Sequence, residues 1–278
     1  MPLGRGERPN PVTARYNPVG VTLASSLLFA IAIATAVPSV AHAQHDHGAV
    51  EHTHHATWSA SAALVAARFS TPSFVGDYQG IAPAVHWTSM RFAASIGAPL
   101  YRITKNGATD YGPGDIVGSG QLVLFGAHAR AAGLALAVSA PTGSERDRLG
   151  MGHVMVMPAA WASYGIGDAV VAASFGYGRA LGAGGGHADH GGGPLVDPMN
   201  FSELTWSATG DLRLARTLSA GVKLVGAVAL DDAGKDRVTG GARVTWGTGR
   251  VQTTAELQGG FVGDPFEVRG VLASLVRF

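Results

Sequence analysis

The sequence predicts an all-β protein that forms a transmembrane, antiparallel, up-and-down β-barrel of about 12 strands, with roughly 10 to 14 strands compatible with the pattern. Three observations lead to this fold class. Charged residues make up only 14% of the chain, whereas 46% of the residues are hydrophobic. Apolar and polar residues alternate with a period of two over segments of about ten residues, the length that a strand needs to cross a bilayer. The last segment ends on an aromatic residue, Phe278, which resembles the C-terminal signal of bacterial outer-membrane proteins.

The overall composition excludes several other classes of protein. The chain has 40 glycines, no cysteine, and 20 basic residues against 19 acidic ones. Without cysteine it cannot be a disulfide scaffold, and its glycines lack the three-residue period of a collagen. A net charge of +1 without a basic stripe argues against a nucleic-acid partner. No apolar run of about 18 residues follows position 44, so membrane-spanning helices are not expected there.

Residues 1–43 are expected to be a cleaved secretory signal peptide. Three arginines and one glutamate lie in the first 20 residues, the apolar run Val21–Val37 follows, and an Ala-x-Ala site ends at Ala43. A membrane anchor is the alternative, because the apolar run is long for a signal peptide. The run is diluted by serine and threonine, however, and no cationic flank follows it. We therefore expect cleavage after Ala43 and location in the cell outer membrane of a Gram-negative bacterium.

The alternation is clearest in the C-terminal half of the chain. Between Ser202 and Leu214 the even positions are mainly apolar and the odd positions are polar or charged, and the same period continues in segments 237–246 and 251–261. We expect strands near residues 58–69, 78–89, 90–103, 115–129, 133–141, 153–165, 169–181, 201–214, 219–230, 237–246, 251–261 and 266–278. Pro99 and Pro158 are awkward inside two of them, since each proline removes one donor from the ladder.

The connections between these segments alternate in length. The long ones include residues 104–114, 142–152 and 182–200, and the short ones include residues 131–132, 165–168 and 247–250. Long extracellular loops and short periplasmic turns are typical of outer-membrane barrels, and they place both termini in the periplasm. A soluble β-sandwich also alternates, but its outward faces would require more charged residues than this chain has.

One region carries a family resemblance beyond the strand pattern. A Gly-x-Gly-Asp strand start is followed by a strand ending in Pro-Thr-Gly, a loop with a late Gly-x-Gly, and a proline-containing strand that ends near a Tyr-x-x-Gly-Asp turn. These pieces are Gly112–Asp115, Pro141–Gly143, Gly150 with Gly152, Pro158, and Tyr164 with Gly167 and Asp168. The run resembles the MetA-pathway of phenol degradation family, a set of transporter-like outer-membrane β-barrels. This resemblance implies a channel or transporter for small, often hydrophobic or aromatic, molecules, and it names no catalytic residue.

Polar positions of the expected strands supply candidates for the lining of the barrel. The residues expected to face the lumen are Arg91, Gln121, Glu203, Asp211, Arg213, Lys223, Arg237, Arg243, Glu256 and Arg269. A lining of mixed sign suits the passage of polar solutes, but it also suits a lumen closed by hydrogen-bonded side chains. A barrel of about 12 strands lies between the small filled barrels and the porins in size. A selective pore and a rigid set of cross-strand ion pairs therefore both stay open.

Two histidine-rich tracts lie outside the strand pattern. The first falls in residues 44–56, expected to be a disordered periplasmic segment ahead of the barrel at 57–278, and the second falls in the longest loop. Their histidines are His45, His47, His52, His54, His55, His187 and His190. Imidazoles beside carboxylates suit Zn, Cu or Ni, so these residues are candidate ligands for a weakly bound divalent metal, although no cofactor is required. Polar tails that bind metal only incidentally are the alternative interpretation.

These observations predict an outer-membrane channel or transporter for the passive passage of small molecules, including hydrophobic or aromatic ones. A metal-handling outer-membrane protein is the first alternative, and a structural or surface-interaction barrel with a closed lumen is the second. We expect no enzyme, because the sequence has no Gly-x-Ser-x-Gly elbow. The expected partners are outer-membrane lipid, a small-molecule solute and, through Phe278, the barrel assembly machinery.

Overall fold

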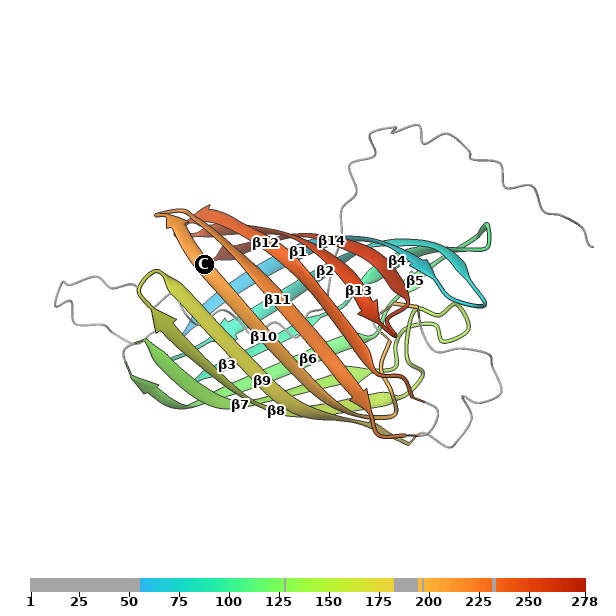
Figure 1. The fold of residues 1–278 in the computed structure, drawn as a ribbon, viewed down its shortest axis with the longest axis horizontal. Coiled ribbons are helices and arrows are strands. Elements are labelled where there is room, and N and C mark those ends of the chain that lie inside the picture. Colours follow the sequence, from blue (N-terminus) through green and yellow to red (C-terminus); the bar gives the residue numbers. More distant parts are fainter. Residues whose placement is uncertain (1–55, 128, 183–194, 197, 232–233) are drawn as a thin grey trace, which may run out of the picture.

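The structure, a computed structural model, describes residues 56–127, 129–182, 195–196, 198–231 and 234–278. These residues form one antiparallel sheet of 14 strands that closes into a barrel (Figure 1). Among them there is no helix long and apolar enough to span a bilayer. The expected signal peptide and nearly all of the histidine-rich segment at 44–56 lie outside the described residues, so both stay predictions.

The strands are long because small, β-branched and aromatic residues follow one another in two-residue alternation. In chain order they are β1 (Thr57–Ser70), β2 (Val75–Thr88), β3 (Phe92–Gly97), β4 (Leu100–Lys105), β5 (Ala108–Pro113), β6 (Ile116–Ala127), β7 (Arg130–Ala140), β8 (Val154–Ile166), β9 (Ala169–Leu181), β10 (Ser202–Ala215), β11 (Leu218–Ala229), β12 (Arg237–Thr248), β13 (Val251–Val262) and β14 (Phe266–Arg277). Apart from the third, each expected strand matches one of these to within a few residues.

Twelve of the strands close the barrel, and the remaining two, β4 and β5, extend from it as a hairpin. The sheet closes because β1 pairs with β14 along its length and with β2 near both of its ends. The ring then runs from β2 through β3 and β6 to β14, so β9 lies six strands from β1 in either direction and directly across the barrel. The predicted fold class, an antiparallel barrel of about 12 strands, is confirmed.

The third expected strand, at 90–103, is wrong as a single strand. It breaks at Ala98 and Pro99, and only its first half, β3, continues the wall by pairing with β6. The second half, β4, pairs with β2 and with β5, a strand that lies inside the expected loop at 104–114. The break follows from Pro99, which has no N–H for the ladder. Asn106 and Gly107 make the turn of this hairpin with φ values of 49° and 87°. An Asn-Gly pair between two alternating segments is a typical hairpin turn, so the expectation of a plain loop at 104–114 is wrong.

The two ends of the barrel differ in the length of their connections. We call one the loop end; its connections are residues 71–74, 106–107, 141–153, 182–201, 230–236 and 263–265. We call the other the turn end; its connections are residues 89–91, 128–129, 167–168, 216–217 and 249–250, and β1 begins and β14 ends there. In Figure 1 the loop end lies on the right, where β4 and β5 are labelled.

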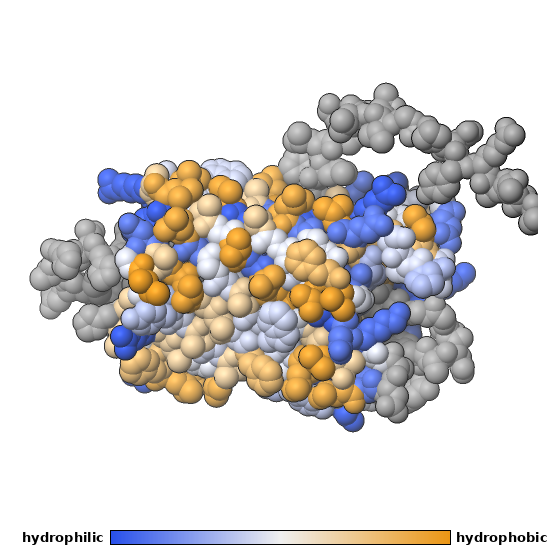
Figure 2. Space-filling view, in the orientation of Figure 1, coloured by the Kyte–Doolittle hydropathy of each residue, from blue (hydrophilic) through white to orange (hydrophobic). Residues whose placement is uncertain are grey.

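The outward face of the barrel is apolar along its length. Leu212, Val222 and Leu257 are exposed members of alternating series on their strands. Figure 2 shows hydrophobic residues spread along the visible face, with strongly hydrophilic residues gathered toward the ends, above all at the loop end. Exposed aromatic side chains lie near the turn end on four strands, namely Trp58, Phe125, Tyr164 and Trp246. An apolar band with aromatic residues at its edge is the outer surface expected of a strand barrel in a bilayer.

Candidate functional site in the barrel interior

The inward faces of β10 to β14 concentrate the charged residues of the barrel wall. The two-residue period that turns leucines and valines outward turns the intervening charged residues inward. Seven of the ten expected lining residues come together on this side of the interior: Glu203, Asp211, Lys223, Arg237, Arg243, Glu256 and Arg269. The interior of the barrel is therefore asymmetric, with its ionisable groups on neighbouring strands.

One ion pair in this wall joins two strands that are not neighbours. Arg243 on β12 donates from Nε to Oδ1 of Asp211 on β10 at 2.8 Å, and its Nη2 bonds the other carboxylate oxygen. The strand between them, β11, places Gly221 opposite both residues. A Cβ at Gly221 would lie 2.2 Å from Asp211 Oδ1. Glycine is required here because any side chain would occupy the space through which the two ions meet.

A second ion pair is almost completely buried at the loop end. Glu203, which is 1% exposed, accepts two hydrogen bonds from Arg237 Nη2, at 2.9 and 2.7 Å. It also accepts bonds from the backbone N–H and the side-chain amide of Asn200, at 2.9 and 2.8 Å. The four hydrogen bonds come from three donor groups and include a cation, so the buried charge is compensated, and the Asn200 bonds hold the end of the 182–201 connection against the wall.

Deeper in the interior, hydrogen bonds through Gln258 link two charged residues. Glu256 accepts a hydrogen bond from the Gln258 amide, and Arg269 Nε donates to Gln258 Oε1 at 2.8 Å. Lys223 stands at the same level of the sheet, because its register neighbours are Gly241 on β12, then Gln258 on β13, then Arg269 on β14. Within the described residues, Lys223 makes no hydrogen bond or ion pair.

These groups border a cavity of about 180 Å³ in the interior. Its polar wall includes Lys223, Glu256 and Arg269, and its apolar wall includes Met157 from β8 and Met199 from the 182–201 connection. The polar and the apolar side chains face the same space because β8 lies on the opposite side of the ring from β13 and β14. The cavity can therefore hold a small solute with one polar end and one apolar end.

The other three expected lining residues lie elsewhere. Arg91 is exposed in the turn before β3, and Arg213 is exposed near the turn end of β10. Gln121 lies on β6, which is six strands from β12 and so on the opposite side of the ring. The expectation of a single lining set thus divides into a charged cluster and three separate positions.

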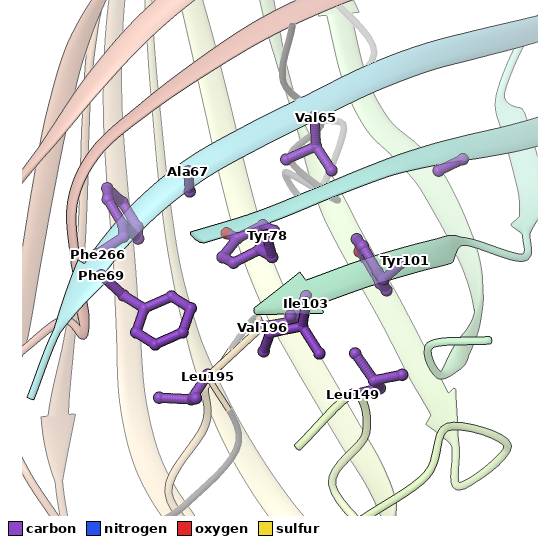
Figure 3. Packing of buried hydrophobic residues seen from close by; sticks show 11 residues of the cluster. Val65, Ala67, Phe69, Tyr78, Tyr101, Ile103, Leu149, Leu195, Val196 and Phe266 are labelled. Carbon is purple, nitrogen blue, oxygen red and sulfur yellow. The ribbon is translucent and has the colours of Figure 1, made fainter. Parts of the chain in front are cut away.

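Two connections fold inward at the loop end and meet an apolar cluster on the far wall. Leu195 and Val196 belong to the connection after β9, yet they pack in one cluster with Phe69 of β1 and Tyr78 of β2. Since β9 lies directly across from β1, these two residues lie on the far side of the barrel mouth from the strand that they follow. Figure 3 shows these residues, with Leu149 of the 141–153 connection, converging on the inward faces of β1, β2 and β4. The loop end is therefore narrowed by packed apolar side chains.

The 141–153 connection is fastened to the wall by one buried carboxylate. Asp115 accepts backbone N–H bonds from Gly143 at 2.8 Å and from Met151 at 2.7 Å. A Cβ on Gly150 would lie 2.5 Å from Asp115 Oδ1 and 2.7 Å from Gly143 Cα. Thr142 continues the contact, accepting from the N–H of Ile116 at 2.8 Å and donating to the carbonyl of Gly114 at 3.0 Å. The residues that carried the family resemblance thus build the anchor of an inward loop, a role that their spacing alone did not reveal.

The histidines fall into two groups, the candidate metal ligands and described residues such as His86. All seven candidate metal ligands lie outside the described residues, and the described part of the chain holds no group of three or more His, Cys, Asp or Glu residues placed to share a metal ion. His86 Nε2 lies 2.8 Å from Ser61 Oγ on the inner wall. No described carboxylate bonds His86, so the serine and histidine lack the third group that orients the base in a hydrolase.

Comparison with known proteins shows similarity in fold. No protein-family model matches the chain, and no curated protein matches its sequence. Among solved structures, the COG4313 outer membrane channel from Pseudomonas putida F1 superposes with a TM-score of 0.60 at 13% identity, covering 84% of this chain and 99% of that one. A KdgM porin superposes with a TM-score of 0.51 at 8% identity, covering 79% of this chain and 99% of that one. The chain therefore has the fold of outer-membrane barrels.

Proposed function

We propose that this protein is an outer-membrane channel for the passive passage of small molecules. The observation that carries the proposal is the contrast between the two faces of one closed wall. The outer face exposes apolar side chains, and the inner face carries charged groups around a cavity. A closed barrel satisfies its backbone hydrogen bonds without water, so it can stand in lipid while it encloses a polar path.

A location in the outer membrane follows from the same contrast. A cationic side chain on the lipid-facing side of a barrel costs about 2–4 kcal/mol near the bilayer midplane. The middle of the outer wall carries residues such as Leu257 and Val222 instead. The aromatic residues near the turn end suit one membrane interface, and the long connections suit the extracellular side. The expected export signal in residues 1–43 agrees with an outer-membrane location, and we propose that the loop end faces the outside of the cell.

The solute class that we propose is small and partly apolar. Apolar side chains narrow the loop end, and methionines border the cavity behind it. Methionine is flexible and polarizable, which suits a surface that accepts apolar groups of varied shape. This lining supports hydrophobic or aromatic solutes, and it agrees with the resemblance to the MetA-pathway family, which we propose as the relationship of this chain.

Reconstitution into a planar lipid bilayer tests the channel. The barrel is first shown to be folded by its heat-dependent shift on a denaturing gel. Folded protein is expected to give discrete conductance steps, and the same preparation after boiling is expected to give none. A folded barrel that inserts but never conducts would contradict the proposal and favour the closed structural barrel. Metal handling stays a prediction, because its histidines lie outside the described residues.

A further inference from the structure

Lys223 is a half-buried cation in the barrel interior whose ammonium group has no partner in the described part of the chain. The residue lies in the middle of β11, on the inward face, and it borders the cavity. Its electrostatic neighbours are Glu256, Arg269 and Arg243, of which one attracts and two repel it. Withdrawing an ammonium group from water without an acceptor is unfavourable. A ligand that brings an acceptor to this place would therefore be stabilised.

The charged groups that act on Lys223 include two cations and one carboxylate. Arg243 is matched by Asp211, with which it forms a two-bond pair. Glu256 is the carboxylate that acts on Lys223, and the two arginines Arg269 and Arg243 repel it. Over the whole lining of the cavity the charges balance, because the cations Lys223, Arg237 and Arg269 are equalled in number by the carboxylates Glu203, Glu256 and Asp264. A cationic side chain inside a pore attracts anions.

A second donor in the same cavity lacks an acceptor. Arg237 uses Nη2 to hold Glu203, but its Nε is buried and has no hydrogen-bond partner within the described residues. Arg237 borders the cavity together with Lys223. Lys223 and Arg237 therefore both border the cavity, and the described chain leaves one donor of each without a hydrogen bond. An oxygen-bearing ligand in the cavity would supply an acceptor for Lys223.

Apolar side chains border the same cavity from other elements. They include Met157 of β8 and Met199 of the 182–201 connection. The Arg269 guanidinium lies over the ring of Phe266, 4.2 Å from its centre, and Phe266 belongs to the apolar cluster at the loop end. The cationic groups are thus continuous with an apolar surface. A bound molecule would meet positive charge at one end and methyl, methylene and aromatic groups at the other.

We infer that this cavity is a binding site for small organic carboxylates that carry an apolar or aromatic body. The carboxylate contacts the Lys223 ammonium and lies beside Arg269, and the body of the ligand contacts the methionines. The inference rests on the proposed function in one respect, since it names the solute class of the same interior. Binding and conduction are separate measurements, so either can fail alone.

Isothermal titration of the folded, detergent-solubilised full chain tests the site. The probes are 3-phenylpropionate, the neutral 3-phenyl-1-propanol and the cationic 3-phenylpropylamine, which share one apolar body. The carboxylate is expected to bind at least about tenfold more tightly than the other two, because a hydrogen bond to a charged group is added. Lys223→Met is expected to remove this preference, and Lys223→Arg is expected to keep most of it. Glu256→Gln is expected to tighten carboxylate binding several-fold, because it removes the competing carboxylate.

Arg213→Met is the matched control, because it removes one positive charge from the exposed turn-end part of β10 and leaves the cavity intact. It is expected to bind the carboxylate as the unaltered protein does. Equal binding of all three probes, or a Lys223→Met protein that binds the carboxylate normally, overturns the inference. Conductance without carboxylate binding overturns the site and leaves the channel standing. Carboxylate binding without conductance leaves the site standing and overturns the channel.

Discussion

Asp115 is the residue whose replacement should most directly open the loop end. Its carboxylate is buried and accepts two backbone N–H bonds, at 2.8 and 2.7 Å, from opposite ends of the 141–153 connection. In Asp115→Ala both N–H groups lose their acceptor. An unsatisfied buried donor costs about 1–3 kcal/mol, so the docked connection loses about 2–6 kcal/mol relative to an undocked one. Even the lower figure reduces the ratio of docked to undocked protein about 30-fold.

Two measurements report this change. Trypsin is expected to cut the Asp115→Ala protein after Arg146 or Arg148 much faster than the unaltered protein, because cleavage requires the connection to leave its docked conformation. Single-channel conductance is expected to rise, because the same connection carries Leu149 into the apolar cluster. Asp115→Asn keeps one acceptor oxygen, so an intermediate effect is expected from it.

Asp77→Ala is the matched control for this experiment. Asp77 also lies near the loop end, but its ion pair with Arg102, at 3.1 Å, is partly exposed. Such a pair contributes about 0–1 kcal/mol, and its loss leaves the 141–153 connection untouched. If Asp115→Ala folds into a heat-shifted barrel whose tryptic cleavage and conductance both equal those of Asp77→Ala, Asp115 does not anchor the connection and the reasoning is refuted.

Two further predictions concern the wall. Arg237→Met leaves the buried Glu203 without its counter-ion and should lower the free energy of unfolding by about 3–5 kcal/mol in a denaturant titration followed by the heat shift on a gel. The double change Arg237→Met with Glu203→Gln should recover part of that loss, and a double variant no more stable than the single one would contradict the stated cause. Leu257→Arg places a cation in the middle of the outer face, where Leu257 is 62% exposed, and should cost about 2–4 kcal/mol when the protein folds into lipid. The same change should have little effect if that face meets water. Val251→Arg, on the same outer face but at the turn end of the strand, is the comparison.

The strand segments were predictable because side-chain alternation is a local property. Leu212 and Asp211 face opposite sides of the wall because they are adjacent in one strand. The β4–β5 hairpin was missed for a different reason. Its two strands are short, and its Asn106-Gly107 turn lay in a stretch that was interpreted as a loop because Pro99 made the preceding strand hard to continue. The Asn106-Gly107 pair indicated the hairpin. Pro99 determines only the point at which β3, in the wall, ends and β4, in the hairpin, begins.

The inward loops could not be predicted from the sequence. The bond between Asp115 and Gly143 joins residues 28 positions apart, and nothing in the local pattern of either residue indicates it. The glycines around it are informative only once the contact is known, since Gly143 and Gly150 lack space for a Cβ because they touch each other. The family resemblance brought the right residues together, but it supplied no reason for them. The structure adds that reason: they are the fixed end of a loop that narrows the mouth.

The lining set shows where strand register adds to alternation. Alternation assigns Asp211 and Arg243 to the inner face, and pairing places each of them opposite Gly221, from the two sides of β11. The ion pair between β10 and β12 then forms over β11, because Gly221 of β11 has no side chain at that level. The same arrangement occurs at the next strand, where Gly241 of β12 lies between Lys223 of β11 and Gln258 of β13. There the residue that faces the cation over the glycine is an amide and not a carboxylate. The two sites have the same backbone geometry and differ in charge pairing. This difference separates the rigid part of the interior, at Asp211 and Arg243, from the part that is able to bind a solute, at Lys223.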